Sequence, residues 1–97
     1  MKPFEFHPEA QSELDEAIGY YEQRVPGLGI DLRKDVESAV RKIQAAPLRW
    51  MPYSKRTRRF LVRRFSYLVI FCELPDKILI VAIAHGKRRP GYWHGRI

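Results

Sequence analysis

One stretch of the sequence decides the fold: Ile78–Trp93, which runs ILIVAIAHGKRRPGYW. Its first seven residues are all apolar and mostly aliphatic, which is typical of a strand buried on both faces. The residues that follow carry three cations, one histidine, two glycines and a Tyr-Trp pair. A buried strand therefore ends here and delivers cationic and aromatic side chains to one edge of the domain.

Two further strands precede this stretch. Tyr67–Glu73 is apolar on both faces, and the short turn Leu74–Lys77 links it to Ile78, so the two strands pair antiparallel. Upstream, Thr57–Arg63 has alternating faces, and the turn Arg63–Ser66 joins it to the central strand. Phe60 and Val62 point to one side of this strand; Arg59, Leu61 and Arg63 point to the other.

In the N-terminal half, apolar residues recur with the period of an α-helix. Apolar residues at positions 10, 14, 17, 18 and 21 form one helical face, which predicts a helix over Pro8–Arg24. The same spacing recurs from Leu32 to Ile43 and predicts a second helix over Gly29–Ala46. Proline and two glycines in Val25–Gly29 require a turn between them, so the helices form an antiparallel hairpin.

The whole chain, residues 1–97, is expected to form one domain. Phe4–His7 alternates apolar and polar residues and adds a short strand, which gives the order β-α-α-β-β-β. We predict a two-layer α+β fold, an antiparallel sheet with the helical hairpin packed on it. The remaining segment, Pro47–Lys55, is expected to be a loop. Its large side chains, Trp50, Met51 and Tyr53, either cover the end of the core or form part of a binding surface.

Charge is distributed unevenly along the chain. Residues 1–50 hold 7 Lys and Arg against 9 Asp and Glu, a net of −2, whereas residues 51–97 hold 11 against 2, a net of +9. This excess indicates either a polyanionic or acidic partner or a solvated basic surface that only maintains solubility.

The sequence lacks the residues that several classes of function require. No glycine-rich phosphate loop occurs, and His7, His85 and His94 lack the spacing of a shared metal site, so we expect no metal and no cofactor. Cys72 is alone and cannot form an internal disulfide. No apolar run is long enough to span a membrane or to form a signal peptide, so we expect a cytoplasmic protein.

The tail also offers groups for RNA cleavage, which requires a base, an acid and cations beside the developing negative charge. His85, Tyr92 and Arg88 are the candidates for these roles. Alternatively, His85 is a neutral histidine that caps the strand end through one hydrogen bond, and Tyr92-Trp93 is an apolar plug that fixes the tail to the sheet.

At this point the chain resembles the RelE/ParE toxin superfamily of bacterial type II toxin–antitoxin modules, and most closely its ParE-like plasmid stabilisation branch. The branch normally has Phe-Pro-Tyr where this chain has Phe65-Ser66-Tyr67. The motifs that carry the resemblance occur in the family's order through nearly the whole chain: His7-Pro8-Glu9-Ala10 with Leu14 and Ala17-Ile18, Tyr20-Tyr21-Glu22, Pro26-Gly27-Leu28-Gly29, Arg63-Arg64-Phe65-Ser66-Tyr67 and Ala84–Trp93.

The resemblance implies the β-α-α-β-β-β fold and a cognate antitoxin, acidic in its binding tail, that wraps the toxin. ParE-like toxins inhibit DNA gyrase, whereas RelE-like toxins are endoribonucleases that cleave mRNA on the ribosome. RelE-like chains commonly have an arginine after the tyrosine that matches Tyr67, but this chain has Leu68. We therefore expect a ParE-like gyrase inhibitor, without settling whether the protein is an enzyme. A toxin that only pairs with its antitoxin is a third possibility.

Candidate site residues follow from both alternatives. If the protein is a nuclease, Arg64 joins the three tail candidates as a substitute for the missing arginine. If it binds a target or an antitoxin, we expect the contacts to come from Arg59, Arg63, Arg64, Lys87, Arg88, Arg89, Tyr92 and Trp93.

Overall fold

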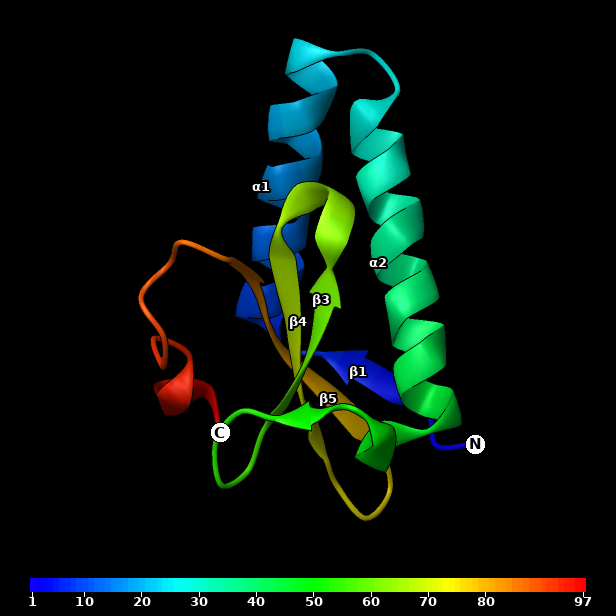
Figure 1. Cartoon of the computed structure of the whole chain (residues 1–97), viewed down its shortest axis with the longest axis vertical. Helices are drawn as coiled ribbons and strands as arrows, with labels where there is room; N and C mark the ends of the chain where they lie inside the picture. Colours follow the sequence, from blue (N-terminus) through cyan, green and yellow to red (C-terminus); the bar gives the residue numbers. More distant parts are fainter.

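The computed structural model describes all 97 residues and has two layers. Helices α1 (Pro8–Arg24) and α2 (Leu28–Ala45) form a hairpin on one face of a five-stranded sheet (Figure 1). The sheet order is β1-β5-β4-β3-β2. Its strands are β1 (Phe4–Phe6), β2 (Met51–Pro52), β3 (Arg58–Val62), β4 (Tyr67–Glu73) and β5 (Ile78–His85). The predicted order of elements is confirmed, with most boundaries within one residue.

The expectation of an antiparallel sheet is correct for β2 to β5 and wrong for β1. β1 lies parallel to β5, with Phe4 opposite Ile78 and Phe6 opposite Ile80. A short turn fixes the direction of the strand that follows it, but β1 meets β5 only after the intervening chain has folded. The expected loop Pro47–Lys55 also contributes two residues to the sheet as β2.

The helical hairpin is fixed by local hydrogen bonds at both ends. His7 caps α1, since its Nδ1 accepts the Glu9 backbone N–H at 3.1 Å. At the tip, the Glu22 carboxylate accepts the N–H groups of Gly27 and Gly29 at 2.8 and 3.0 Å. A Cβ at Gly29 would lie 2.4 Å from the Ile18 carbonyl oxygen, so the helices approach this closely only because that residue is glycine.

Two apolar clusters form, one on each face of the sheet. The larger has fifteen buried residues and lies between the helices and the sheet. The smaller lies on the opposite face under the C-terminal tail, residues 86–97, and contains Ile70, Cys72, Val81, Ala82, Ala84 and Trp93. Trp93 is 2% exposed, which confirms its interpretation as a plug. Neither α1 nor α2 combines the length and the apolar composition that a membrane-spanning helix requires.

The aromatic residues of the segment before β3 mostly cover the core. Trp50 packs edge-on against Phe60, with ring centroids 4.6 Å apart. Tyr53 stacks on Trp93 at 5.2 Å and so completes the cover over the smaller cluster. Met51 differs, because it is 58% exposed and lies at the edge of the sheet.

Candidate functional site

The tail is held in place by one carboxylate, that of Glu13 on α1. The Tyr92 hydroxyl donates to Glu13 Oε2 at 2.8 Å. Arg96 Nη1 and Nη2 donate to Oε1 and Oε2, both at 2.9 Å, in a bidentate pair. The Ile83 backbone N–H donates to Oε1 at 3.0 Å. The side chains of Glu13 and Arg96 are only 12% and 9% exposed, so solvent screens this pair weakly.

The sheet itself explains why Glu13 and Arg96 are needed there. β1 ends at Phe6, opposite Ile80, so beyond that point β5 is paired with β4 on one side and has no partner strand on the other. A bulge lies next to this end: Ile70 pairs with Ala82 whereas Phe71 pairs with Ile80, which leaves Val81 without a counterpart. Arg96 donates to the Val81 carbonyl at 3.0 Å, and Glu13 accepts from Ile83. Together the two side chains satisfy the backbone groups that β1 does not reach.

Protonation at this cluster follows from the same contacts. Burial raises the pKa of Glu13, but hydrogen bonds from Arg96, Tyr92 and Ile83 outweigh that effect and leave the pKa below its ordinary value of 4.5. Burial and the hydrogen bond to Glu13 raise the pKa of Tyr92 far above its ordinary value. The hydrogen bonds that Arg96 donates to Glu13 likewise raise the pKa of Arg96. Near neutral pH, Glu13 is therefore ionised while Tyr92 keeps its proton.

Arg88 joins the cluster from the tail. Its guanidinium lies over the Tyr92 ring, 3.9 Å from the centroid, and its Nη1 is 3.5 Å from Glu13 Oε2. His85 Nδ1 accepts the Lys87 backbone N–H at 3.2 Å, which confirms that this histidine caps the end of its strand. Lys87 and Arg89 are exposed and form no ion pair.

The four nuclease candidates are divided between two places. Arg88 and Tyr92 meet at Glu13. Arg64 and His85 line a cavity of about 540 Å³ together with Lys87 and other residues of the β3–β4 turn and the tail. Arg64 Nη2 is also 2.9 Å from Asp31 Oδ2 on α2. His85 is the link between the two groups, because it borders a second cavity with Arg88 and Glu13.

The remaining predicted contact residues are Arg59, which lies on β3, and Arg63, which begins the short 3-10 helix Arg63–Phe65 after β3. Arg59 covers the ring of Tyr53 at 4.7 Å and lines a groove together with Arg63. Arg63 forms no ion pair. The structure thus divides the predicted contact residues: Lys87, Arg88 and Arg89 lie in the tail, whereas Arg59 and Arg63 line the groove beside β3.

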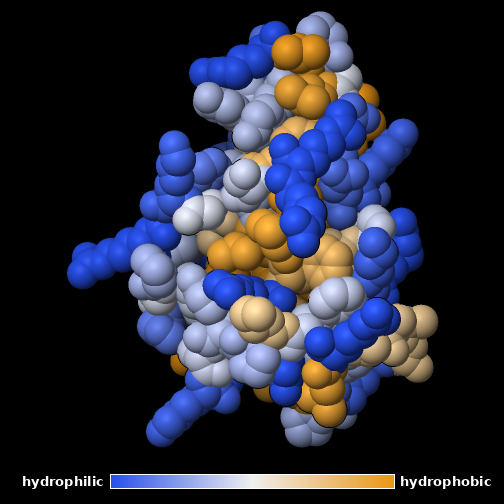
Figure 2. Space-filling model, in the orientation of Figure 1, coloured by the Kyte–Doolittle hydropathy of each residue, from blue (hydrophilic) through white to orange (hydrophobic).

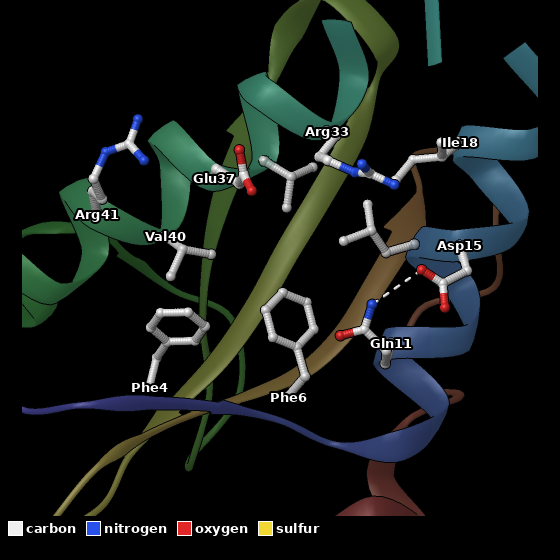
Figure 3. Close-up of a pocket in the computed structure, with 11 residues that line it drawn as sticks. Phe4, Phe6, Gln11, Asp15, Ile18, Arg33, Glu37, Val40 and Arg41 are labelled. Atoms are coloured by element: carbon white, nitrogen blue, oxygen red, sulfur yellow. Dashed lines mark hydrogen bonds between the residues drawn. The ribbon is translucent and has the colours of Figure 1, made fainter. Parts of the chain in front are cut away.

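A different cavity, of about 600 Å³, opens between β1 and the two helices. Phe4 and Phe6 point into it from β1, and its rim carries charges of both signs (Figure 3). The rim residues are Asp15, Arg33, Glu37 and Arg41. Because acids and bases balance there, this cavity does not select a partner by the sign of its charge.

Sequence reasoning missed Glu13 and Arg96. One signal was present for Glu13, since it follows Ala10 by three residues and so lies at the border of the apolar stripe of α1. An acidic residue at such a position requires a partner when the helix packs on a sheet. No local pattern pointed to Arg96, which lies 83 residues away in the sequence.

Comparison with protein families identifies the chain. The family model described as the ParE toxin of type II toxin–antitoxin system, parDE, matches residues 4–90. The chain belongs to the ParE toxin family. It is therefore the toxin component of a type II module, as the sequence motifs indicated, and the family implies an antitoxin partner. In this ParE-family toxin, Tyr92, Trp93 and Arg96 lie beyond the matched range.

A solved structure supports the fold independently. The chain is similar to one from the chromosomal ParDE TA system from P. aeruginosa, with a TM-score of 0.76 and 17% identity. The similarity covers 88% of this chain and 96% of that chain. Comparison with curated protein sequences finds no match. The predicted β-α-α-β-β-β fold is thus confirmed by the ParE family match and by a structural neighbour.

Proposed function

We propose that this ParE-family toxin inhibits DNA gyrase through the exposed cations of its tail, Lys87, Arg88 and Arg89. Tyr92 and Trp93 anchor that surface to the sheet. The observation that carries the proposal is the cluster at Glu13, in which Tyr92 and Arg88 already contact a carboxylate. The cluster gives the tail a fixed shape, which favours recognition of a protein surface over chemistry on RNA.

Three features of the tail argue against a nuclease. The Tyr92 hydroxyl donates to Glu13 and its pKa is raised, so it is a poor base at neutral pH. One face of its ring is covered by Arg88. Trp93 is buried under the stacked ring of Tyr53, so an RNA base cannot stack on its indole ring. Leu68 also lacks the cation that RelE-like chains commonly have at that position.

A supercoiling assay with purified gyrase and purified toxin tests the proposal. We expect inhibition that rises with toxin concentration, and we expect Arg88→Ala to raise the half-inhibitory concentration by about tenfold. The matched control is Arg33→Ala, which removes the same charge from the exposed side of α2. Full supercoiling at high excess of folded toxin would reject gyrase as the target, and equal effects of the two variants would reject the tail as the contact.

One observation favours the RelE-like alternative. Arg64, His85 and Lys87 line a single cavity, and its wall contains no acidic residue. Basic side chains of this kind bind the negative charge of a phosphodiester. Primer extension on mRNA from a translating extract tests it. New 5′ ends that appear with the toxin and disappear with Arg64→Ala would support cleavage, whereas an unchanged pattern would exclude this cavity as a ribonuclease site.

A further inference from the structure

The first strand, β1, leaves one of its two edges open. It is the end strand of the sheet and pairs only with β5. The Pro3 carbonyl accepts a backbone N–H of β5, and the His7 N–H donates to a backbone carbonyl of β5, both at 2.9 Å. Because the backbone groups of successive strand residues point alternately to the two sides, those of Phe4 and Phe6 point away from β5. An open strand edge of this kind can pair with another chain.

The cavity between β1 and the two helices presents apolar side chains beside the same edge. Its apolar residues are Phe4, Phe6, Leu14, Ile18, Val36 and Val40. Phe4 is 46% exposed, and its ring meets that of Phe6 edge-on, with centroids 5.9 Å apart. Both rings point from β1 toward α1 and α2 (Figure 3). A partner that adds a strand to β1 would therefore also remove apolar surface from water.

The four charged side chains at the rim of this cavity have no ion-pair partner within the chain. Asp15 and Glu37 bring two negative charges, and Arg33 and Arg41 bring two positive charges. Asp15 accepts a hydrogen bond from the uncharged Gln11 side chain, at 3.0 Å. Along α2, the three rim residues follow one another at intervals of four, so they lie on one helical face with alternating sign. The rim is therefore complementary to a copy of itself.

The opposite edge of the sheet lacks this balance of charge. β2 pairs with β3 at Arg58 and Arg59, which leaves Phe60–Val62 open. Figure 2 shows apolar side chains in the middle of the face that lies over β3 and β4, with hydrophilic side chains around them. The charged residues of the groove beside β3 are all basic: Lys42, Arg59 and Arg63. Two copies joined through that edge would bring two sets of three cations together, and like charges across an interface are unfavourable.

We propose that two copies of the toxin associate through β1 and the cavity beside it, about a twofold axis that joins their sheets into one. Such an interface uses the same surface on both copies, so that surface must be complementary to itself. The rim meets this condition, because the acids Asp15 and Glu37 of each copy face the bases Arg33 and Arg41 of the other. The open backbone groups of the two β1 strands supply the main-chain hydrogen bonds.

The pairing of the two strands fixes what lies at the axis. Antiparallel β1 strands that place Phe4 opposite Phe6 of the second copy let both residues exchange their hydrogen bonds, and this register puts Glu5 opposite Glu5. Such residues have Cα atoms about 4.5 Å apart. Each Glu5 carboxylate lies 3.2 Å from Lys77 Nζ, so the two acids meet with their charges compensated. The tail cations take no part in this interface, so the proposal is independent of whether gyrase is the target.

The balanced rim favours a second copy over other partners. An acidic polypeptide or a nucleic acid would meet Asp15 and Glu37 with a charge of the same sign. A basic polypeptide would meet Arg33 and Arg41 in the same unfavourable way. Of these partners, only a second copy offers a base for each acid, an acid for each base and an open strand edge.

Sedimentation equilibrium of the whole toxin, from micromolar to near-millimolar concentration, is the first test. We expect the average mass to rise from that of one chain, 11.5 kDa, toward twice that value. Hydrogen exchange over the same range should show slower exchange of the backbone amides of Phe4 and Phe6 as the concentration rises. The mass of one chain at every concentration, or protection at β3 in place of β1, would overturn the proposal.

Two complementary variants give a sharper test. Arg33→Glu/Arg41→Glu has an acidic rim and Asp15→Lys/Glu37→Lys a basic one, and all four positions are exposed. We expect each variant alone to dimerise about tenfold more weakly, because its charge contacts become repulsive, and an equimolar mixture to recover the dimer. Lys34→Glu, an exposed change on α2 outside the cavity, is the control and should alter the dimer Kd by less than about twofold.

Circular dichroism of each variant verifies that it is folded. A mixture of the two folded variants that stays monomeric would overturn the proposal, and so would a loss in Lys34→Glu as large as that in either double variant.

A disulfide bond locates the axis. Glu5→Cys brings two thiols within disulfide reach when the two β1 strands pair in the register given above. Mild oxidation should therefore link this variant into a dimer that a reductant separates. Lys55→Cys, an exposed change at the opposite edge of the sheet, is the control and should remain mostly unlinked. The native thiol, Cys72, is buried. Equal linkage at the two positions, or none in Glu5→Cys, would overturn the proposal.

Other occupants of the edge are distinguished by three probes added to dilute, monomeric toxin. The probes are a peptide that alternates valine and glutamate, a peptide that alternates valine and lysine, and an RNA oligonucleotide. We expect none of them to slow hydrogen exchange at Phe4 and Phe6. Protection of these amides by one probe would assign the edge to that class of partner and would overturn its assignment to a second copy.

Discussion

The two faces of the sheet are covered in different ways. On one face, two helices bury fifteen residues through regularly spaced aliphatic side chains. On the other, the tail contributes Trp93, which packs with five buried residues of the sheet, and the tail is held by the Glu13–Arg96 pair. The helical face depends on area removed from water, whereas the tail face depends on a few polar contacts with defined geometry.

This difference indicates which part of the toxin opens first. Stability is not uniform in a protein, and segments with few buried apolar contacts open at lower free energy than the core. The tail also buries the Trp93 indole Nε1 without a hydrogen-bond partner. This unpaired polar group lowers the free energy that the packing of the tail contributes to stability. We therefore expect the tail to open at lower free energy than the helical face, although it carries the proposed contacts.

The largest effect is expected on the helical face. Leu32→Ala removes a fully buried side chain from α2 and should lower the free energy of unfolding by about 3 kcal/mol, because it leaves a cavity in the core. Urea denaturation followed by circular dichroism measures this loss. A loss below about 1 kcal/mol would mean that the hairpin is not the main support of the sheet.

A smaller and more local effect is expected at the tail. Glu13→Gln leaves the poorly exposed Arg96 guanidinium without its buried, bidentate ion-pair partner, so we expect the free energy of unfolding to fall by about 2 kcal/mol. Hydrogen exchange and limited proteolysis should show faster opening of residues 86–97 before the rest of the chain. The control is Glu9→Gln, since Glu9 is mostly exposed and its oxygen lies 3.5 Å from Arg96. Equal losses in both variants would contradict the role given to Glu13.

Acid should destabilise the packing of the tail on the sheet, as the Glu13→Gln substitution does. Because the pKa of Glu13 is lower in the folded protein, its ionised form contributes stability above the ordinary value of 4.5. That contribution is lost as the pH falls from 4.5 through the lowered folded pKa. Tail exchange measured from pH 6 downward should therefore accelerate below that value in the unmodified toxin, relative to Glu13→Gln. Parallel pH profiles would refute this assignment.

The smallest effect is expected for Trp93→Phe. The change removes some buried area, but it also removes the indole N–H that has no partner, so the two contributions oppose each other. We expect the free energy of unfolding to change by less than about 1.5 kcal/mol. A loss as large as that of Leu32→Ala would show that the tail face is as dependent on apolar packing as the helical face.

Local patterns in the sequence were sufficient for most of the fold. The helical period fixed α1 to the residue, and the turn chemistry of Leu74–Lys77 fixed the antiparallel pairing of β4 and β5. Part of the candidate site could be predicted in the same way, since Lys87, Arg88 and Arg89 directly follow a buried strand. These features depend on residues that are close in the chain, whose periodicity and turn preferences act locally.

The tertiary structure alone decided the rest. The parallel pairing of β1, the bulge at Val81 and the open edge of β3 depend on which strands become neighbours. Glu13 and Arg96, 83 residues apart, meet because β5 has backbone groups that β1 does not reach. No local pattern encodes such a contact, because the need for it arises only when the sheet has formed. The sequence by itself therefore determined the elements and the charge of the tail, and only their packing decided what holds that tail to the sheet.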